Sequence, residues 1–149
     1  MKNIILFVLA LTITTNVFCQ IYDPVKWTTS TEKISETEYE LVATATIEGQ
    51  WHLYSQNVPE NGPIPTTFTF KSDKNYLKKG NTKEGEGHMV DDKVFNMKIK
   101  YFSKKADFKQ RIKLKTKTNF EVNASVEFMV CDDERCLPPT EVDLVFNIE

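Results

Sequence analysis

The stretch that decides the fold reads Phe120-Glu121-Val122-Asn123-Ala124-Ser125-Val126-Glu127-Phe128-Met129-Val130. Apolar and polar side chains alternate along almost all of it. A period of two places the apolar side chains on one face of an extended strand and the polar side chains on the other face. The stretch therefore predicts a long β-strand with one buried face.

The same period recurs on both sides of this stretch. Alternating runs lie at residues 39–47, 67–70, 95–101, 108–114 and 142–148, and turn-forming residues such as Gly49, Gly62-Pro63, Gly80-Asn81 and Asp91-Asp92 separate them. Six or seven such strands predict an all-β fold, an immunoglobulin-like antiparallel β-sandwich. Residues 55–65 and 78–93 show no hairpin pattern and are expected to form loops.

The amino-terminal segment has the features of a signal peptide. Lys2 supplies the positive end, residues 4–11 the apolar core, and Val17-Phe18-Cys19 a cleavage site. Residues 1–19 are expected to be removed, which leaves residues 20–149 as a single domain. The apolar run is shorter than the roughly 20 residues of a membrane-spanning helix. A lipid-anchored Cys19 is the less favoured alternative, because bulky Phe18 precedes it.

Charge and histidine content argue against several function classes. The formal net charge of −2 is small and evenly mixed, so neither nucleic acid nor an anionic membrane is indicated as a partner. His52 and His88 lie outside any hydrolase or metalloprotease motif. Their wide separation is unlike a zinc finger, although a zinc site with the cysteines stays a third alternative. No cofactor and no metal are expected.

Cys131 and Cys136 are the informative chemical feature. Export would place them where disulfides persist. Continuing the strand pattern by one residue puts Cys131 on the polar face, so both sulfurs are expected near the surface. A six-residue ring stabilises a domain by only about 2 kcal/mol in the chain-entropy model, less than a longer ring would. The residues alone leave redox exchange and structural pinning equally open.

The residues around the pair bear on its reactivity. The acidic run Asp132-Asp133-Glu134 should raise nearby thiol pKa values, whereas Arg135 should lower the pKa of Cys136. Cys136 is therefore the candidate for the more reactive thiolate. Pro138-Pro139 excludes a helix with its amino terminus at the sulfur, so an electron partner would have to supply the activated thiol.

The segment Val130-Cys131-Asp132-Asp133-Glu134-Arg135-Cys136-Leu137-Pro138-Pro139 resembles the cysteine loop of the amino-terminal periplasmic domain of the DsbD thiol:disulfide interchange reductase family. Glu48-Gly49-Gln50-Trp51-His52-Leu53-Tyr54 is similar to that family's acidic-Gly-aromatic-Leu-Tyr strand. Residues 61–70 are similar to its Pro-containing strand, and residues 91–102 to its aromatic loop. The similarity spans nearly the whole predicted mature chain.

The resemblance implies an immunoglobulin-like periplasmic domain with Cys131 and Cys136 as its redox pair, Cys136 forming the mixed disulfide with the donor. It also implies that Phe95 caps the pair, with His52 and Tyr54 beside it. A thioredoxin-like or membrane electron-transfer protein would be the donor, and a periplasmic disulfide oxidoreductase the acceptor.

Two departures from the family pattern stand out. The cysteine spacing is one residue shorter than in the best-known members, and no membrane or thioredoxin domain is expected after Glu149. The donor is therefore expected to be a separate protein. The alternative function is a non-catalytic exported β-sandwich binding module with an inert disulfide.

Overall fold

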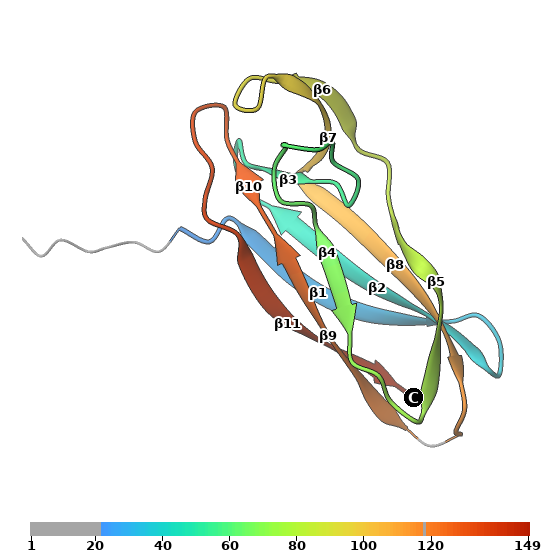
Figure 1. Ribbon diagram of the computed structural model, residues 1–149. Helices are drawn as coiled ribbons and strands as arrows, with labels where there is room; N and C mark the ends of the chain where they lie inside the picture. Colours follow the sequence, from blue (N-terminus) through green and yellow to red (C-terminus); the bar gives the residue numbers. More distant parts are fainter. Residues whose placement is uncertain (1–21, 118) are drawn as a thin grey trace, which may run out of the picture.

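The computed structural model describes residues 22–117 and 119–149 (Figure 1). The predicted signal peptide, residues 1–19, and with it Cys19, lies outside the described residues. The regular elements of the described residues are all β-strands: β1 Val25–Lys33, β2 Glu38–Ile47, β3 His52–Tyr54, β4 Thr67–Phe70, β5 Tyr76–Glu84, β6 His88–Asp92, β7 Met97–Ser103, β8 Lys105–Leu114, β9 Phe120–Phe128, β10 Val130–Cys131 and β11 Thr140–Ile148.

The strands pair antiparallel in three sheets, ordered β1-β2-β8-β5, β10-β3-β7-β6 and β11-β9-β4. Alternate side chains of β2, β8, β9 and β11 are buried, as the period-two pattern predicts, and they form one main core. Trp27 on β1 contacts the rings of Phe68, Phe108 and Phe128 across this core. The prediction of an all-β, immunoglobulin-like antiparallel sandwich is confirmed.

The prediction that residues 78–93 form a loop is wrong. β5 pairs with β8, and β6 pairs with β7. Gly80, at φ 67°, lies in a bulge where the β5–β8 register shifts, and the buried Gln110 amide donates to the Lys79 and Gly80 carbonyls there. Both strands lie at sheet edges and are largely exposed, so alternation is absent from their sequences. These strands, with β1 and the short β3 and β10, bring the described total to eleven instead of six or seven.

The sheet β10-β3-β7-β6 has two faces with different surroundings. Val130, Leu53 and Phe102 belong to the main core. The next residues along β10 and β3, Cys131 and Tyr54, belong to a second, smaller cluster on the other face. In Figure 1 these four strands gather at the upper end of the molecule. The second face positions the site described below.

Residues 55–66 contain no strand, in agreement with the loop predicted at residues 55–65. The loop is fastened at its first residues, because the Glu84 carboxylate accepts hydrogen bonds from the Ser55 hydroxyl (2.7 Å) and the Gln56 amide (2.8 Å). Lys100 donates to the same carboxylate at 2.9 Å. Among residues 22–117 and 119–149 there is no helix of the length and apolarity needed to cross a membrane.

Candidate redox site

Cys131 and Cys136 face each other across a tight hairpin and form a disulfide, with their Cα atoms 4.0 Å apart. The Leu137 amide donates to the Val130 carbonyl and the Asp132 amide to the Arg135 carbonyl, both at 2.9 Å. These bonds lie on either side of the cysteine pair, which is therefore a non-hydrogen-bonded pair, the position where side chains across a ladder approach most closely. The backbone thus brings the two sulfurs together.

Asp132 shapes the turn of this cysteine loop, residues 131–136. One oxygen of its carboxylate accepts hydrogen bonds from the Glu134 amide (2.9 Å) and the Arg135 amide (2.8 Å), the usual way in which an aspartate stabilises a turn. These two bonds hold the pKa of the Asp132 carboxyl below its ordinary value. The acidic residue therefore has a local structural role in addition to its charge.

The prediction that both sulfurs lie near the surface is wrong for Cys131, which is 0% exposed; Cys136 is half-buried. The alternation itself is confirmed, since Val130 faces the main core and Cys131 faces the opposite side. That side is not solvent, because other segments cover it. We call this covered group the disulfide cluster: Tyr54, Ile99 and Cys131, with Val58, Phe95, Met97, Tyr101, Met129 and Cys136 packed against them.

His52 and Tyr54 reach the cysteines through the register of β3. His52 is the cross-strand partner of Cys131, and Leu53 that of Val130. Side chains of directly opposite residues share one face of a sheet, so His52 lies on the same face as Cys131. The His52 ring stacks on Tyr101 at 4.3 Å between centroids and meets the Tyr54 ring edge-on at 5.6 Å. Burial lowers the pKa of His52, opposed by the nearby carboxylates of Asp92, Asp133 and Asp132.

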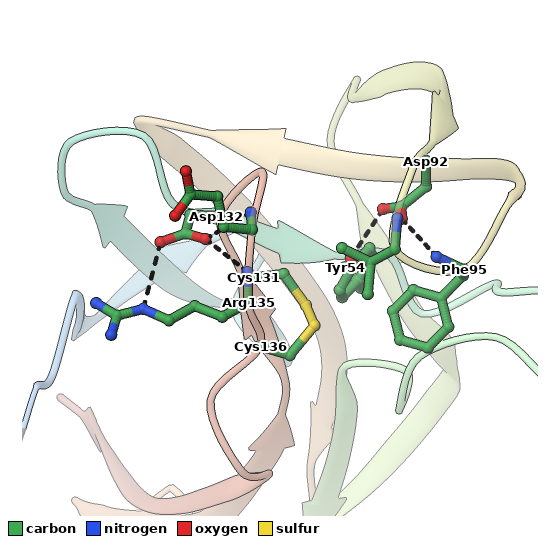
Figure 2. The surroundings of a disulfide bond; sticks show 9 residues. Tyr54, Asp92, Phe95, Cys131, Asp132, Arg135 and Cys136 are labelled. Atoms are coloured by element: carbon green, nitrogen blue, oxygen red, sulfur yellow. Dashed lines mark hydrogen bonds and ion pairs between the residues drawn. A yellow bond between two sulfur atoms is a disulfide. The ribbon is translucent and has the colours of Figure 1, made fainter.

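Asp92 is a site residue that the sequence analysis missed. Its carboxylate accepts a hydrogen bond from the Tyr54 hydroxyl at 2.8 Å, and both side chains are buried. Its other oxygen accepts from the amides of Val94 (2.9 Å) and Phe95 (3.0 Å), as Figure 2 shows in part. Burial and this bond raise the pKa of Tyr54. The sequence marks Asp91-Asp92 as turn-forming residues, and no sequence signal links them to Tyr54.

The alternation of Phe95 with Met97 predicts that Phe95 belongs to a strand. The structure instead places Phe95 in the β6–β7 turn. Asp92 interrupts the pattern, because its side chain closes a turn at residues 93–96 before β7 begins. The Phe95 ring is half-buried, meets Tyr54 edge-on at 5.9 Å and packs in the disulfide cluster with Cys136. Figure 2 shows the disulfide on the side of its loop that faces Tyr54 and Phe95.

Arg135 extends away from the disulfide (Figure 2). Its Nε atom lies 3.6 Å from the second carboxylate oxygen of Asp132, and its guanidinium lies 5.7 Å from the centre of the Trp51 ring. The structure therefore brings Cys131, Cys136, His52, Tyr54 and Phe95 together, and it directs the Arg135 charge elsewhere.

A pocket of about 180 Å³ lies between the cysteine loop and the β6–β7 hairpin, and its lining includes His52, Tyr101, Asp91, Asp92, Asp132 and Asp133. His88 also contacts the Tyr101 ring, at 6.3 Å between centroids. Within the residues that the structure describes, no three His, Cys, Asp or Glu side chains are grouped so that they could hold a metal ion.

Comparison with solved structures places the fold. The reduced DsbD amino-terminal domain of Neisseria meningitidis is 9% identical and superposes with a TM-score of 0.51, over 80% of this chain and 82% of that one. The amino-terminal periplasmic domain of ScsB from Proteus mirabilis is 16% identical, with a TM-score of 0.52 over 81% of this chain and 44% of that one. At these identities the likeness shows the fold alone. No curated protein sequence matches the chain.

The family comparison goes further than the fold. The model of the family described as thiol:disulfide interchange protein DsbD, N-terminal, matches residues 24–146. That match includes the cysteine loop, β3 and the β6–β7 hairpin, so every residue of the candidate site falls within it. The family's role is thiol:disulfide interchange, and its domain is periplasmic. The chain therefore belongs to the DsbD amino-terminal domain family.

Proposed function

We propose that this protein relays electrons in the periplasm from a thioredoxin-like or membrane electron-transfer donor to oxidised periplasmic proteins, through the Cys131–Cys136 pair. The observation that carries the proposal is that the two cysteines of this hairpin are buried to different extents. Cys136 is half-buried, whereas Cys131 is fully buried. A disulfide with one reachable side offers a defined point of attack. As a staple it adds little, because backbone hydrogen bonds already close the same hairpin.

The chemistry follows from this asymmetry. A thiolate of the donor attacks Sγ of Cys136, the bond to Cys131 breaks, and Cys131 leaves with the electron pair. A second thiol of the donor then resolves the mixed disulfide and leaves the pair as a dithiol. In the delivery direction, the Cys136 thiolate attacks the acceptor's disulfide, and Cys131 resolves that mixed disulfide.

The surrounding residues would control access to the pair. Phe95 covers it from the β6–β7 turn, which Asp92 closes, while His52 and Tyr54 line it from β3. Arg135 would act by keeping the cysteine loop in place through Asp132 and Trp51. Opening the Phe95 side would expose Cys136 to a partner's active site.

Trapping with single-cysteine variants tests the proposal. Cys131→Ser leaves Cys136 free and should capture a periplasmic thioredoxin-like protein as a mixed disulfide, whereas the matched Cys136→Ser variant leaves the buried Cys131 and should capture far less. The reduction potential of the wild-type pair should lie above about −300 mV. A lower potential, together with no captured partner, would establish the alternative: an exported binding module with an inert disulfide.

Export is part of the same proposal. Cleavage after Cys19 would give a mature protein that begins at Gln20, which mass spectrometry of the periplasmic fraction can measure. A fatty-acylated Cys19 in the membrane fraction would instead show a lipid-anchored protein.

A further inference from the structure

Reduction of the Cys131–Cys136 disulfide requires protons as well as electrons. Reducing a disulfide to two thiols takes two electrons and two protons. Residue Cys136 is only half-buried, whereas Cys131 is 0% exposed. A thiolate left in an apolar cluster is unfavourable because it has lost its hydration. A side chain that brings a proton to Cys131 would therefore favour opening of the disulfide.

Two polar side chains of β3 lie on the Cys131 face, and they differ in their freedom to give up a proton. The Tyr54 hydroxyl donates its proton to Asp92 at 2.8 Å, and burial together with this bond raises the pKa of Tyr54. Tyr54 therefore keeps its proton at neutral pH. His52 is the direct cross-strand partner of Cys131, and imidazole is the side chain that ordinarily changes charge near neutral pH.

His52 also has a route to solvent. Its side chain is only 6% exposed, yet it forms part of the lining of the pocket beside the cysteine loop. The charged and titratable groups that face it there come from the β6–β7 hairpin, the cysteine loop and β7: Asp91, Asp92, Lys93, Asp132, Asp133 and Tyr101. Burial lowers the pKa of His52 below its ordinary value, and the nearby acids only partly offset this effect. The neutral ring is therefore the main form at neutral pH, and the imidazolium forms as the pH falls.

The stacking contacts fix the ring for this task. His52 packs face to face on Tyr101 and edge-on against Tyr54, which restricts its rotation. The β3 backbone sets its distance from Cys131, because directly opposite side chains have Cβ atoms about 4.5–5.5 Å apart. His52 therefore lies on the same face of the sheet as Cys131 and also lines the pocket.

We infer that His52 carries the proton of Cys131, giving it when the disulfide opens and taking it back when the disulfide forms, and exchanges it with solvent through the adjacent pocket. In reduction, the donor's thiolate bonds to Sγ of Cys136, the Cys131 sulfur leaves with the electron pair, and the His52 imidazolium protonates it. In the reverse step neutral His52 removes that proton, and the resulting thiolate displaces the partner from Cys136. This inference rests on the proposed function.

The test measures reduction of the purified oxidised protein by dithiothreitol between about pH 5 and 9, with each rate divided by the dithiothreitol thiolate concentration. In the wild type, the normalised rate should fall at least about tenfold as pH rises and the His52 imidazolium is lost. His52→Gln should be slow at acidic pH and independent of pH. The matched control His88→Gln, which alters the other histidine against Tyr101, should keep the wild-type profile.

A second measurement does not depend on the variants. Nuclear magnetic resonance of the wild-type protein gives the pKa of the His52 ring, which should coincide with the pH of the kinetic inflection. A wild-type rate that does not change with pH, an inflection that persists in His52→Gln, or a mismatch between the two pKa values would overturn the inference.

The experiment also separates this inference from the proposed function. If no thioredoxin-like donor reduces the disulfide but the dithiothreitol profile depends on His52, the electron relay fails and the proton-transfer role stands. If a donor reduces the disulfide but the profile is unaffected by His52→Gln, only the proton-transfer role is wrong.

Discussion

Replacing Tyr54 by Phe removes one hydroxyl group from the buried wall of the site and keeps the ring. The lost group donates a hydrogen bond to Asp92 at 2.8 Å. Tyr54 is 0% and Asp92 6% exposed, so water can restore little of this bond. The other Asp92 oxygen keeps its bonds to the Val94 and Phe95 amides, which confines the change to a single oxygen.

The expected loss in the free energy of unfolding depends on the charge of the hydrogen-bond acceptor. A hydrogen bond to a charged group contributes about 1.5–3 kcal/mol, and a bond between neutral groups about 1 kcal/mol. Tyr54→Phe leaves a buried carboxylate oxygen without its donor, so we expect the free energy of unfolding to fall by about 2 kcal/mol. Because the ring remains in the disulfide cluster, little of this loss should come from packing.

The assay is urea unfolding of the oxidised protein at neutral pH. An unchanged slope of the free energy of unfolding against urea concentration shows that the surface exposed on unfolding has not changed. Tyr76→Phe is the matched control, because the hydroxyl of this buried main-core tyrosine donates to the Lys71 backbone carbonyl, a neutral acceptor. It should lose only about 1 kcal/mol. Equal losses in the two variants would refute the special role of the Tyr54–Asp92 bond.

Three further changes have defined outcomes. Phe95→Ala should increase the rate of disulfide reduction by a small phosphine several-fold in a kinetic assay, because the ring packs with the cysteines; an unchanged rate would mean that Phe95 does not shield them. Gly87→Ala should cost about 1–3 kcal/mol in urea unfolding, since a Cβ there would lie 2.7 Å from the Tyr101 carbonyl oxygen; Gly85→Ala, with its nearest contact at 3.6 Å, should cost clearly less. Burial raises the pKa of Glu84, but its bonds from Gln56, Ser55 and Lys100 lower it further, so the net shift is downward. The stabilisation it provides is therefore complete above its ordinary pKa of 4.5 and lost as pH falls through the lower folded-state value. Glu84→Gln should destabilise the protein at neutral pH, and thermal unfolding should show that difference vanish in strong acid.

Strands with one buried face were predictable from the sequence. β2, β8, β9 and β11 alternate because one face of each packs in the main core. β5 and β6 were missed, since an edge strand exposed on most sides has no reason to alternate. Gly80-Asn81 predicts a turn, but the positive φ of Gly80 also suits a bulge, and only the pairing of β5 with β8 distinguishes the two.

The candidate site was predictable in its members and not in its geometry. The cysteine loop, His52, Tyr54 and Phe95 came from the residues and from the family resemblance. Asp92 and the direction of Arg135 did not, because a carboxylate between Tyr54 and the β6–β7 turn requires segments far apart in the chain to meet. Likewise, no sequence pattern predicts that Arg135 pairs with Asp132 and lies over the Trp51 ring.

By itself the sequence determined that the domain is an antiparallel β-sandwich and that Cys131 points away from the main core, because side-chain period is a local property of an extended backbone. Only the tertiary structure decided that Cys131 is buried, since the face it points to is covered by residues brought from other strands and loops, among them Tyr54, Phe95 and Ile99. Local pattern sets the direction of a side chain, whereas its exposure depends on what the rest of the chain packs against it. That difference makes the two cysteines unequal and is the reason why a proton carrier at Cys131 would favour opening of the disulfide.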